Sequence, residues 1–291
     1  MKNKIGIVTV TYNSSKRITQ LLESIYREVN IVAQTIIIEN SSPDKLATKN
    51  KVEAFMRNHS RHIIKMIINQ TNDGFAKSCN QGAKILDSDY ILFINPDTEF
   101  EAGQLGALYS HAVSMDADII GGKVTKYSKG KHDTVVRSPN LLIGLLEFSN
   151  LGKLLNINYG HNRFYYKDTP DIYNAREDKL VDAVGGAYLL VKRDSFDKLG
   201  GFDERFFMYL EDVDLGKRAN EKNMRVVYCP HSTIRHEGGA SSKNKYKIMH
   251  NAWYDSRKKY YLKHFGFITN FIIQPIFTLE EKILQIIRQV K

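Results

Sequence analysis

The stretch IGIVTVTYNSSKRITQLLESIYREV, residues 5–29, combines two patterns of different period. Residues 5–12 form a compact β-branched run, which is typical of a buried strand. A turn with two serines follows, and a serine is the expected cap of the next helix. Apolar residues then recur at helical spacing and fall on one face: Ile18, Leu21, Leu22, Ile25 and Val29. This stretch therefore predicts a strand followed by a helix.

Similar patterns alternate through the first half of the chain. Further strands are predicted at residues 35–39, 62–68 and 90–94, and helices at 53–58 and 76–86. Such alternation indicates an α/β fold with a mostly parallel sheet that helices cover on both faces. Ligands bind such sheets outside the carboxyl ends of the strands. The residues directly after each strand are therefore the candidates for a site.

Polar residues cluster at these positions. They are Thr11-Tyr12-Asn13, Glu39-Asn40-Ser41, residues 69–75 and Asn95-Pro96-Asp97. Pro96 lacks an N–H and biases Asn95 toward an extended conformation, so the strand ends at a defined place with Asp97 in the crevice. A carboxylate there can chelate a divalent cation. The alternative is that Asp97 caps the following helix, expected at residues 101–115, or stabilises a turn.

The composition places limits on the class of protein. The 291 residues, 42% of them hydrophobic, are enough for one large or two small domains with a substantial core. The two cysteines, Cys79 and Cys229, cannot make a disulfide framework and form no Cys-x-x-Cys pair, which favours a reducing cytosol. The first apolar run is too short and strand-like for a signal peptide, and no run is long enough to span a bilayer. The net charge of +10 indicates an anionic partner.

A second group of candidates lies at residues 181–223. An apolar strand is expected to carry Gly185 and Gly186, and adjacent glycines in a strand indicate close approach of a ligand or another backbone. An aromatic stretch then leads into acids at 211, 212 and 214 that open a helix. Asp214 and Arg218 form an i, i+4 pair, so Asp214 is interpreted as structural. Glu211 and Asp212 lack such a helical partner and are the candidates for chemistry.

The last part of the chain, residues 243–291, differs in composition. It carries ten Lys or Arg residues against three acids, together with many aromatic side chains. Pro275 is expected to break any continuous helix there. Basic amphipathic segments of this kind lie on anionic membrane surfaces. The alternatives are an oligomer interface or a helix packed back on the domain.

Six segments, taken in order, resemble the inverting family 2 glycosyltransferases of the GT-A fold, especially their bacterial rhamnosyltransferase-like branch. They are VTVTYNSS, IIIENSS, NDGFAKSCNQG, LFINPDTEF, residues 185–218 and IRHEGGASS. The resemblance covers about residues 4–242. It implies a GT-A domain at 1–242, with a nucleotide-binding half at 1–121 and an acceptor-binding half at 122–242. Residues 243–291 then form a separate amphipathic helical tail.

The resemblance also implies a metal site. Asn95-Pro96-Asp97 matches the family's Asp-x-Asp motif, so Asp97 is expected to hold Mn²⁺ or Mg²⁺ against the diphosphate of a nucleotide sugar. Asn95 departs from the usual first aspartate, which removes one charge from the site. His236 matches the C-terminal histidine that completes the metal or diphosphate site. Without its flanking residues, His236 would be interpreted as an ordinary surface histidine.

Donor binding is implied for the ends of the first strands. Thr11, Tyr12 and Asn13 match the loop around the base and ribose, and Glu39 stands where the family usually has an aspartate that bonds the base. The stretch N-x-G-F-x-x-x-x-N is expected to pass beneath the nucleotide and sugar, although Phe75 could equally belong to the core. The complete expected donor set is Thr11, Tyr12, Asn13, Glu39, Asn40, Asn72, Gly74, Phe75, Asn80 and Asn95.

Catalysis is assigned by the same resemblance. Asp212 matches the aspartate of the family's Glu-Asp motif and is expected to be the general base that takes the proton of the acceptor hydroxyl. Glu211 is the alternative base, or it orients the acceptor. Gly185 and Gly186 match the segment that lines the acceptor pocket.

The predicted function is an inverting transfer of a sugar to a growing bacterial cell-surface glycan, such as O-antigen, capsule or cell-wall polysaccharide. The expected donor is dTDP-L-rhamnose, and the acceptor is expected to be polyprenyl-diphosphate-linked. The alternative donor is a UDP-hexose carrying galactose, glucose or an N-acetylhexosamine. The expected location is cytoplasmic and peripheral on the inner face of the plasma membrane, through the tail, with a homo-oligomer as a further option.

Two other classes fit less well. A sugar-1-phosphate nucleotidyltransferase normally has a Gly-rich phosphate loop near its first strand, and TVTYNSSKR lacks that pattern. A non-enzymatic protein that binds nucleic acid through the basic tail would explain the net charge but not the ordered motifs.

Overall fold

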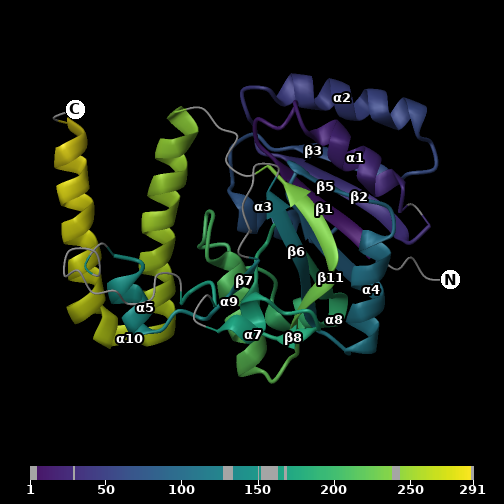
Figure 1. Cartoon of the computed structure of the whole chain (residues 1–291). Coiled ribbons are helices and arrows are strands. Elements are labelled where there is room, and N and C mark those ends of the chain that lie inside the picture. Colours follow the sequence, from purple (N-terminus) through teal and green to yellow (C-terminus); the bar gives the residue numbers. More distant parts are fainter. Residues whose placement is uncertain are drawn as a thin grey trace.

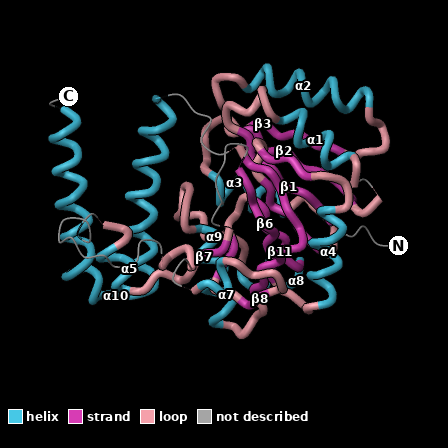
Figure 2. Tube along the Cα trace, in the orientation of Figure 1, coloured by secondary structure: helices cyan, strands magenta, loops and turns pink. Residues whose placement is uncertain are grey.

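The computed structural model describes residues 5–28, 30–126, 134–149, 151, 163–166, 169–237 and 243–289. It shows a central sheet with helices packed on both faces and two long helical segments set to one side (Figure 1). The tube in Figure 2 separates the strands of the sheet from the helices that cover them.

The main sheet has nine strands. Eight follow the spatial order β3 (Ile64–Ile68), β2 (Val32–Glu39), β1 (Ile5–Thr11), β4 (Tyr90–Ile94), β10 (Tyr188–Lys192), β6 (Ile119–Lys126), β11 (Val226–His236) and β5 (Thr98–Phe100), and β8 (Lys179–Leu180) pairs with β11. The first four are parallel to one another, and β11 is parallel to β6. By contrast, β10 is antiparallel to both of its neighbours. The prediction of a mostly parallel α/β sheet is confirmed.

A second sheet of two short strands pairs β7 (Val135–Val136) with β9 (Ala183–Val184). Gly185 and Gly186 follow β9 and precede β10, so they lie between two strands. The prediction that they lie inside one strand is wrong, because the chain leaves the small sheet at this point and enters the large one.

The helices are α1 (Ile18–Tyr26), α2 (Lys45–Asn58), α3 (Phe75–Ala83), α4 (Gln104–Ser114), α5 (Leu141–Leu146), α7 (Pro170–Tyr173), α8 (Arg193–Leu199), α9 (Glu211–Glu221) and α10 (Lys243–Gln289). They create one apolar cluster on each face of the sheet. In β4, Leu92 and Ile94 belong to one cluster, whereas Ile91 and Phe93 belong to the other. Burial of both faces explains why the strand is a continuous apolar run.

The first helix packs through the expected apolar face, because Ile18, Leu21, Leu22 and Ile25 are fully buried. Val29 lies outside the described residues. The expected serine cap is wrong, since Arg17 occupies the N-cap position and makes no side-chain capping bond. The Ser14 hydroxyl instead accepts a hydrogen bond of 3.2 Å from the Tyr12 N–H, so it serves the loop after β1.

The tail is an antiparallel helical hairpin. Its two limbs, residues 243–265 and 267–289, meet at Gly266, which has φ 57° and ψ −137° (Figure 1). The predicted break at Pro275 is wrong, because Pro275 lies inside the second limb. Glycine reaches positive φ without a steric penalty and can reverse the chain, whereas proline removes only one helical N–H.

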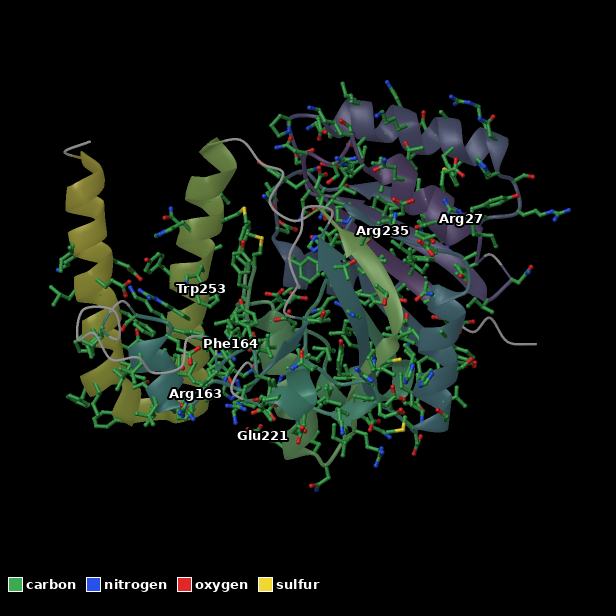
Figure 3. All side chains as sticks on the ribbon, in the orientation of Figure 1. Arg27, Arg163, Phe164, Glu221, Arg235 and Trp253 are labelled. Carbon is green, nitrogen blue, oxygen red and sulfur yellow. The ribbon has the colours of Figure 1, made fainter. Side chains whose placement is uncertain are left out.

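Buried aromatic residues join the hairpin to the rest of the molecule. Tyr260, Tyr261 and Phe277 are fully buried in a third apolar cluster that includes Phe206 and Leu210. The Phe148 ring lies 5.0 Å from that of Phe164 and 4.9 Å from that of Trp253. Figure 3 shows Trp253 on the first limb and Phe164 in the segment that faces it. The hairpin is thus packed against the domain, as one of the alternatives for the tail expected.

The packing of the hairpin does not define where the domain ends and the tail begins. The division between a domain at 1–242 and a tail at 243–291 stays a prediction, since residues 238–242 lie outside the described chain. Within the described ranges, none of the helices combines the length and the apolar character needed to cross a membrane.

Candidate active site

The loop after β4 brings together two side chains that are 139 positions apart. Asp97 Oδ1 lies 3.0 Å from His236 Nε2, and Asn95 Nδ2 lies 3.4 Å from the same nitrogen. The strands produce this meeting, because β5 and β11 pair antiparallel with Thr98 opposite His236. The Glu237 N–H also donates to the Asp97 carbonyl at 3.1 Å.

The turn between β4 and β5 holds Asp97 in place. The Thr98 hydroxyl donates to the Asn95 carbonyl at 2.6 Å. Directly after Asp97 the chain enters β5, and α4 begins only at Gln104, with Gly103 at its N-cap position. Asp97 therefore does not cap that helix. On the other side of the site, the Glu237 carboxylate forms a bidentate ion pair with Arg17.

This group of side chains fits a divalent cation of the Mn²⁺ type. Asp97 offers a carboxylate oxygen and His236 an imidazole nitrogen, and both side chains are partly open to solvent. Rotating the Asn95 amide by half a turn presents its oxygen in place of its nitrogen. Carboxylate, amide and imidazole groups together suit Mn²⁺, whereas Mg²⁺ would prefer oxygen ligands and water.

The second acidic group opens α9. Tyr209 and Leu210 both have positive φ, 74° and 64°, which is uncommon for residues other than glycine. This sharp turn presents Asp212, whose Oδ2 accepts a 2.7 Å hydrogen bond from the Gly186 N–H. Its Oδ1 accepts a 2.8 Å bond from the Val213 N–H.

The two neighbouring acids differ in their environment. Glu211 is buried, and desolvation, with the nearby Asp212 and Asp214 charges, raises its pKa well above the ordinary value. Its Oε2 is buried and has no hydrogen-bond partner within the described part of the chain. Desolvation also raises the pKa of Asp212, but the N–H groups of Gly186 and Val213 act to lower it. Burial therefore disfavours the charged form of both carboxyls, and the two main-chain N–H groups partly offset this effect for Asp212.

A short run of main chain connects the two acidic groups. Gly186 bonds Asp212, and the carbonyl of the next residue, Ala187, accepts a 3.2 Å hydrogen bond from the Asn95 N–H. A Cβ atom on Gly186 would lie 3.3 Å from the Phe75 ring and 3.6 Å from Asp212 Oδ2. A side chain at this position would therefore press on the Phe75 ring and contact the carboxylate. Gly185 is also close, with its N–H donating to the Thr134 carbonyl at 2.8 Å.

Three of the expected donor residues form a buried network below the crevice. Glu39 is fully buried, and its oxygens accept bonds from the Thr11 hydroxyl at 2.6 Å and the Ser42 N–H at 2.8 Å. Asn40 donates to the Gly74 carbonyl at 3.0 Å. These side chains hold the ends of β1 and β2 to each other and to the loop before α3. Tyr12 and Asn13, in contrast, are partly exposed and exposed at the rim.

The N-x-G-F-x-x-x-x-N stretch, residues 72–80, contacts the loop before α9. Asn72 accepts a 3.1 Å bond from the Gly74 N–H, and Gly74 has φ 83°. A Cβ there would lie 2.4 Å from the Phe207 carbonyl. Asn80 bonds both the carbonyl and the N–H of Phe202, at 2.8 and 2.9 Å. The contacts of Gly74 with Phe207 and of Asn80 with Phe202 could not be predicted from sequence spacing, because these partners are more than a hundred positions apart.

Asp214 has partners that the sequence analysis missed. The expected pair with Arg218 is confirmed at 2.8 Å, but the tail also reaches this fully buried carboxylate through His264 at 2.8 Å and Lys263 at 2.5 Å. Burial acts to raise the pKa of Asp214, yet the bond from His264 and the Arg218 and Lys263 charges lower it overall. The hairpin is therefore bonded directly to the helix that carries Asp212.

The residues after β4 and the first turn of α9 thus form one connected site, through Gly186 and Ala187, at the carboxyl end of a parallel strand. Residues 6–171 match the family described as Glycosyl transferase family 2. This chain belongs to that family and is a family 2 glycosyltransferase.

Its relatives include rhamnosyltransferases. The chain is 24% identical over 260 residues to the N-acetylglucosaminyl-diphospho-decaprenol L-rhamnosyltransferase of Mycobacterium tuberculosis (strain H37Rv), covering 83% of this chain and 78% of that protein. It is 30% identical over 145 residues to the rhamnosyltransferase WbbL of Escherichia coli (strain K12), covering 50% of each.

Solved structures confirm the GT-A fold. The mannosyltransferase PcManGT from Pyrobaculum calidifontis, in complex with GDP-Man and Mn²⁺, matches with a TM-score of 0.62 at 12% identity, over 89% of this chain and 65% of that one. S. aureus TarS in complex with UDP-GlcNAc matches with a TM-score of 0.53 at 16% identity, over 86% of this chain and 65% of that one. This chain thus spans slightly less than two thirds of either solved chain.

Proposed function

We propose that this protein transfers a sugar, with inversion, from a nucleotide diphosphate donor to a hydroxyl of a growing cell-surface glycan. The observation that carries the proposal is the short connection between the two acidic groups. Asp212 is bonded to Gly186, the adjacent Ala187 is bonded to Asn95, and Asn95 lies beside the pair of Asp97 and His236. This connection brings the proposed base, Asp212, close to the side chains proposed to bind the cation.

Asp212 acts as the general base in this proposal. It takes the proton of the acceptor hydroxyl as that oxygen bonds to the anomeric carbon, and the bond from this carbon to the diphosphate breaks. The N–H groups of Gly186 and Val213 orient the carboxylate and leave it ionised. An inverting transfer needs no second nucleophilic carboxylate. Glu211, buried and protonated, therefore orients the acceptor or the base.

Asp97, His236 and Asn95 are the side chains proposed to hold Mn²⁺ or Mg²⁺. The ion would supply positive charge that stabilises the departing diphosphate. The Mn²⁺ in the mannosyltransferase relative of the same fold supports a divalent metal.

The donor is proposed to lie over the ends of β1 and β2. Tyr12 and Asn13 at the rim contact the base and ribose, while Thr11 and Asn40 hold the loops that shape the floor. Contact of Glu39 with a base requires it to exchange its bond to Thr11 or Ser42. The residues proposed beneath the donor are Asn72, Gly74, Phe75, Asn80 and Asn95, and those beside the acceptor are Gly185 and Gly186.

The donor sugar is proposed to be L-rhamnose, from dTDP-rhamnose. The two rhamnosyltransferase relatives support this choice, and the decaprenol acceptor of one of them supports a polyprenyl-diphosphate-linked acceptor. A UDP-hexose is the second candidate, supported by the UDP-GlcNAc complex of a protein with the same fold.

Calorimetric titration with dTDP-, UDP- and GDP-sugars, each with and without Mn²⁺, tests the donor. Metal-dependent binding of dTDP-rhamnose above the others is the expected result. Preference for a UDP-sugar would retain the mechanism and discard rhamnose. Absence of binding to every donor would contradict the catalytic assignment as a whole.

The tail is proposed to place the enzyme on the inner face of the plasma membrane. Phe267 and Phe271, at the start of the second limb, are 75% and 67% exposed, and their ring centroids lie 4.7 Å apart. Adjacent exposed aromatic side chains on a basic helical segment suit an anionic lipid interface. Pairing of two copies through the same residues is the alternative.

A further inference from the structure

We propose that His111, Asp178 and Cys229 form a zinc site, separate from the pair of Asp97 and His236. The three residues come from α4, from the segment just before β8 and from β11. One ring nitrogen of His111, an Asp178 carboxylate oxygen and the Cys229 Sγ all lie within 4.8 Å of one another. Zinc bonds of about 2.0–2.3 Å put tetrahedral ligand atoms roughly 3.3–3.8 Å apart, so small side-chain rotations complete the site.

The chemistry of the three groups selects the metal. Imidazole, carboxylate and thiolate are all ordinary zinc ligands. A soft thiolate disfavours Mg²⁺ and Mn²⁺, which prefer oxygen. Zinc would displace the Cys229 thiol proton, form the Zn–S bond and release that proton to solvent. A solvent molecule would occupy the fourth position, on the side where His111 is partly exposed.

An unsatisfied oxygen points to a missing partner. The Asp178 side chain is only 10% exposed, and its Oδ2 lies 2.6 Å from His111 Nδ1. Its Oδ1 is buried and has no nitrogen or oxygen donor among the described residues, and the Cys229 thiol that also faces this carboxylate is a weak donor. A buried acceptor without a strong donor is unfavourable. A cation bound between Asp178 and Cys229 would satisfy it.

A second histidine supports the first. The His231 ring stacks on that of His111, with centroids 4.8 Å apart and an angle of 16° between the planes. Its Nε2 lies 3.9 Å from a carboxylate oxygen of Glu177. This stacking restricts the plane of the His111 ring, so the ring is oriented before a metal binds.

The position of the site indicates what zinc would do. The pairing of β11 with β6 shifts register between Cys229 and Thr233, and the end of β11 carries His236. A zinc ion would fasten α4 to β11 on the near side of this irregularity. It would therefore stabilise the strand that brings His236 to Asp97.

Titration of the full chain with Co²⁺ tests the proposal, because a cobalt–thiolate bond gives a charge-transfer band that oxygen and nitrogen ligands do not. The band is expected to appear in the wild type and to disappear when Zn²⁺ is added. The two cysteines provide matched variants. Cys229→Ala should abolish the band, whereas Cys79→Ala, in α3, should retain it. Asp97→Ala should also retain it, which separates this site from the catalytic one.

Further variants guard against an effect of misfolding. Asp178→Asn and His111→Ala should each weaken Zn²⁺ binding at least tenfold, while the circular dichroism spectrum of the metal-free protein stays unchanged. Zn²⁺ should raise the melting temperature of the wild type and of Cys79→Ala, but not of Cys229→Ala. The absence of a thiolate band in wild-type protein, or its persistence in Cys229→Ala, would overturn the proposal.

Discussion

The Gly186 N–H donates a 2.7 Å hydrogen bond to Asp212 Oδ2, and this bond joins the segment before β10 to the start of α9. Gly186 lies between the small sheet and β10, whereas Asp212 lies in the first turn of α9. A charged acceptor makes the bond stronger than one between neutral groups. The bond thus holds the Asp212 carboxylate beside Gly186, whose neighbour Ala187 accepts a hydrogen bond from the Asn95 N–H at the end of β4.

Asp212→Asn is expected to abolish transfer and to leave donor binding within about twofold of the wild type. A positioned general base contributes about 10²–10⁴-fold to the rate, and the amide cannot accept the acceptor proton. Product formation and donor titration measure the two effects. Equal turnover by the variant and the wild type would move the base to Glu211 or elsewhere.

Glu211→Gln is expected to retain transfer and to raise stability at neutral pH. The folded-state pKa of Glu211 is raised, so its contribution to stability is fully present below the ordinary value of 4.5 and is lost as the pH rises toward the raised value. The melting temperature of the variant should therefore exceed that of the wild type increasingly above about pH 5.

The control for that pH series is Glu221→Gln, at the exposed end of α9. It removes an acid from the same helix without changing the buried pair of Glu211 and Asp212. Its melting temperature should stay close to that of the wild type at every pH. A pH-independent effect of Glu211→Gln would mean that the buried carboxyl is ionised.

Substitutions around Asp97 are expected to change metal dependence in opposite directions. Asp97→Ala should weaken donor binding by at least about tenfold, or about 1.4 kcal/mol, and make it indifferent to Mn²⁺. Asn95→Asp should tighten Mn²⁺ binding by about tenfold, because affinity rises with the charge of the oxygen ligands. Glu101→Gln, an exposed acid that pairs with Arg235, is the control and should leave both measurements unchanged.

Lys263→Met is expected to destabilise the fold by about 1.5–3 kcal/mol, because it removes one of three partners of the buried Asp214 carboxylate and a bond to Asp203. Its partner Asp214 is fully buried. Lys259→Met is the matched control, because the pair with Asp255 is exposed and surface pairs contribute at most about 1 kcal/mol. Urea unfolding of both variants measures the difference, and equal losses would show that Asp214 needs no partner from the tail.

Acid should remove the stabilisation that the pair of Lys263 and Asp214 contributes. The folded-state pKa of Asp214 lies below its ordinary value of 3.8, so the carboxylate stabilises the fold above that value and the contribution is lost as the pH falls through the lowered value. The difference between the wild type and Lys263→Met should therefore shrink below about pH 4. A difference that stays constant across the series would exclude the ion pair as its cause.

The double substitution Phe267→Ser, Phe271→Ser is expected to reduce binding to anionic vesicles without lowering the melting temperature. Both rings are exposed, so their loss removes little from the folded core. The control is Phe265→Ser on the other side of Gly266, a partly buried ring stacked on Tyr261, which should instead destabilise the protein. If vesicle binding were unchanged and a dimer dissociated, these rings would form a subunit interface.

Local pattern was enough to predict the strands and the first helices. The β-branched run of β1 and the apolar spacing of α1 need only neighbouring residues to be interpreted, because burial on one or both faces imposes a period on the sequence. The end of β4 at Asn95-Pro96 could be predicted for the same reason, since proline restricts its own backbone and that of the preceding residue. Local pattern gave a wrong result for the start of α1, where a serine was expected as the cap but Arg17 occupies the N-cap position.

The sequence by itself determined the α/β fold, the order of its elements and the polar residues at the strand ends. Only the tertiary structure decided which of these residues meet. It brought His236 to Asp97 and Gly186 to Asp212, and it buried Glu39 against the Thr11 hydroxyl and Asn80 against the main chain of Phe202. It also turned the tail at Gly266 and bonded Lys263, in the first limb, to Asp214. The physical reason is that backbone propensity and the spacing of apolar residues depend on near neighbours in the chain. Strand pairing and buried charge pairs join positions that are far apart in the chain, so the local sequence does not reveal them.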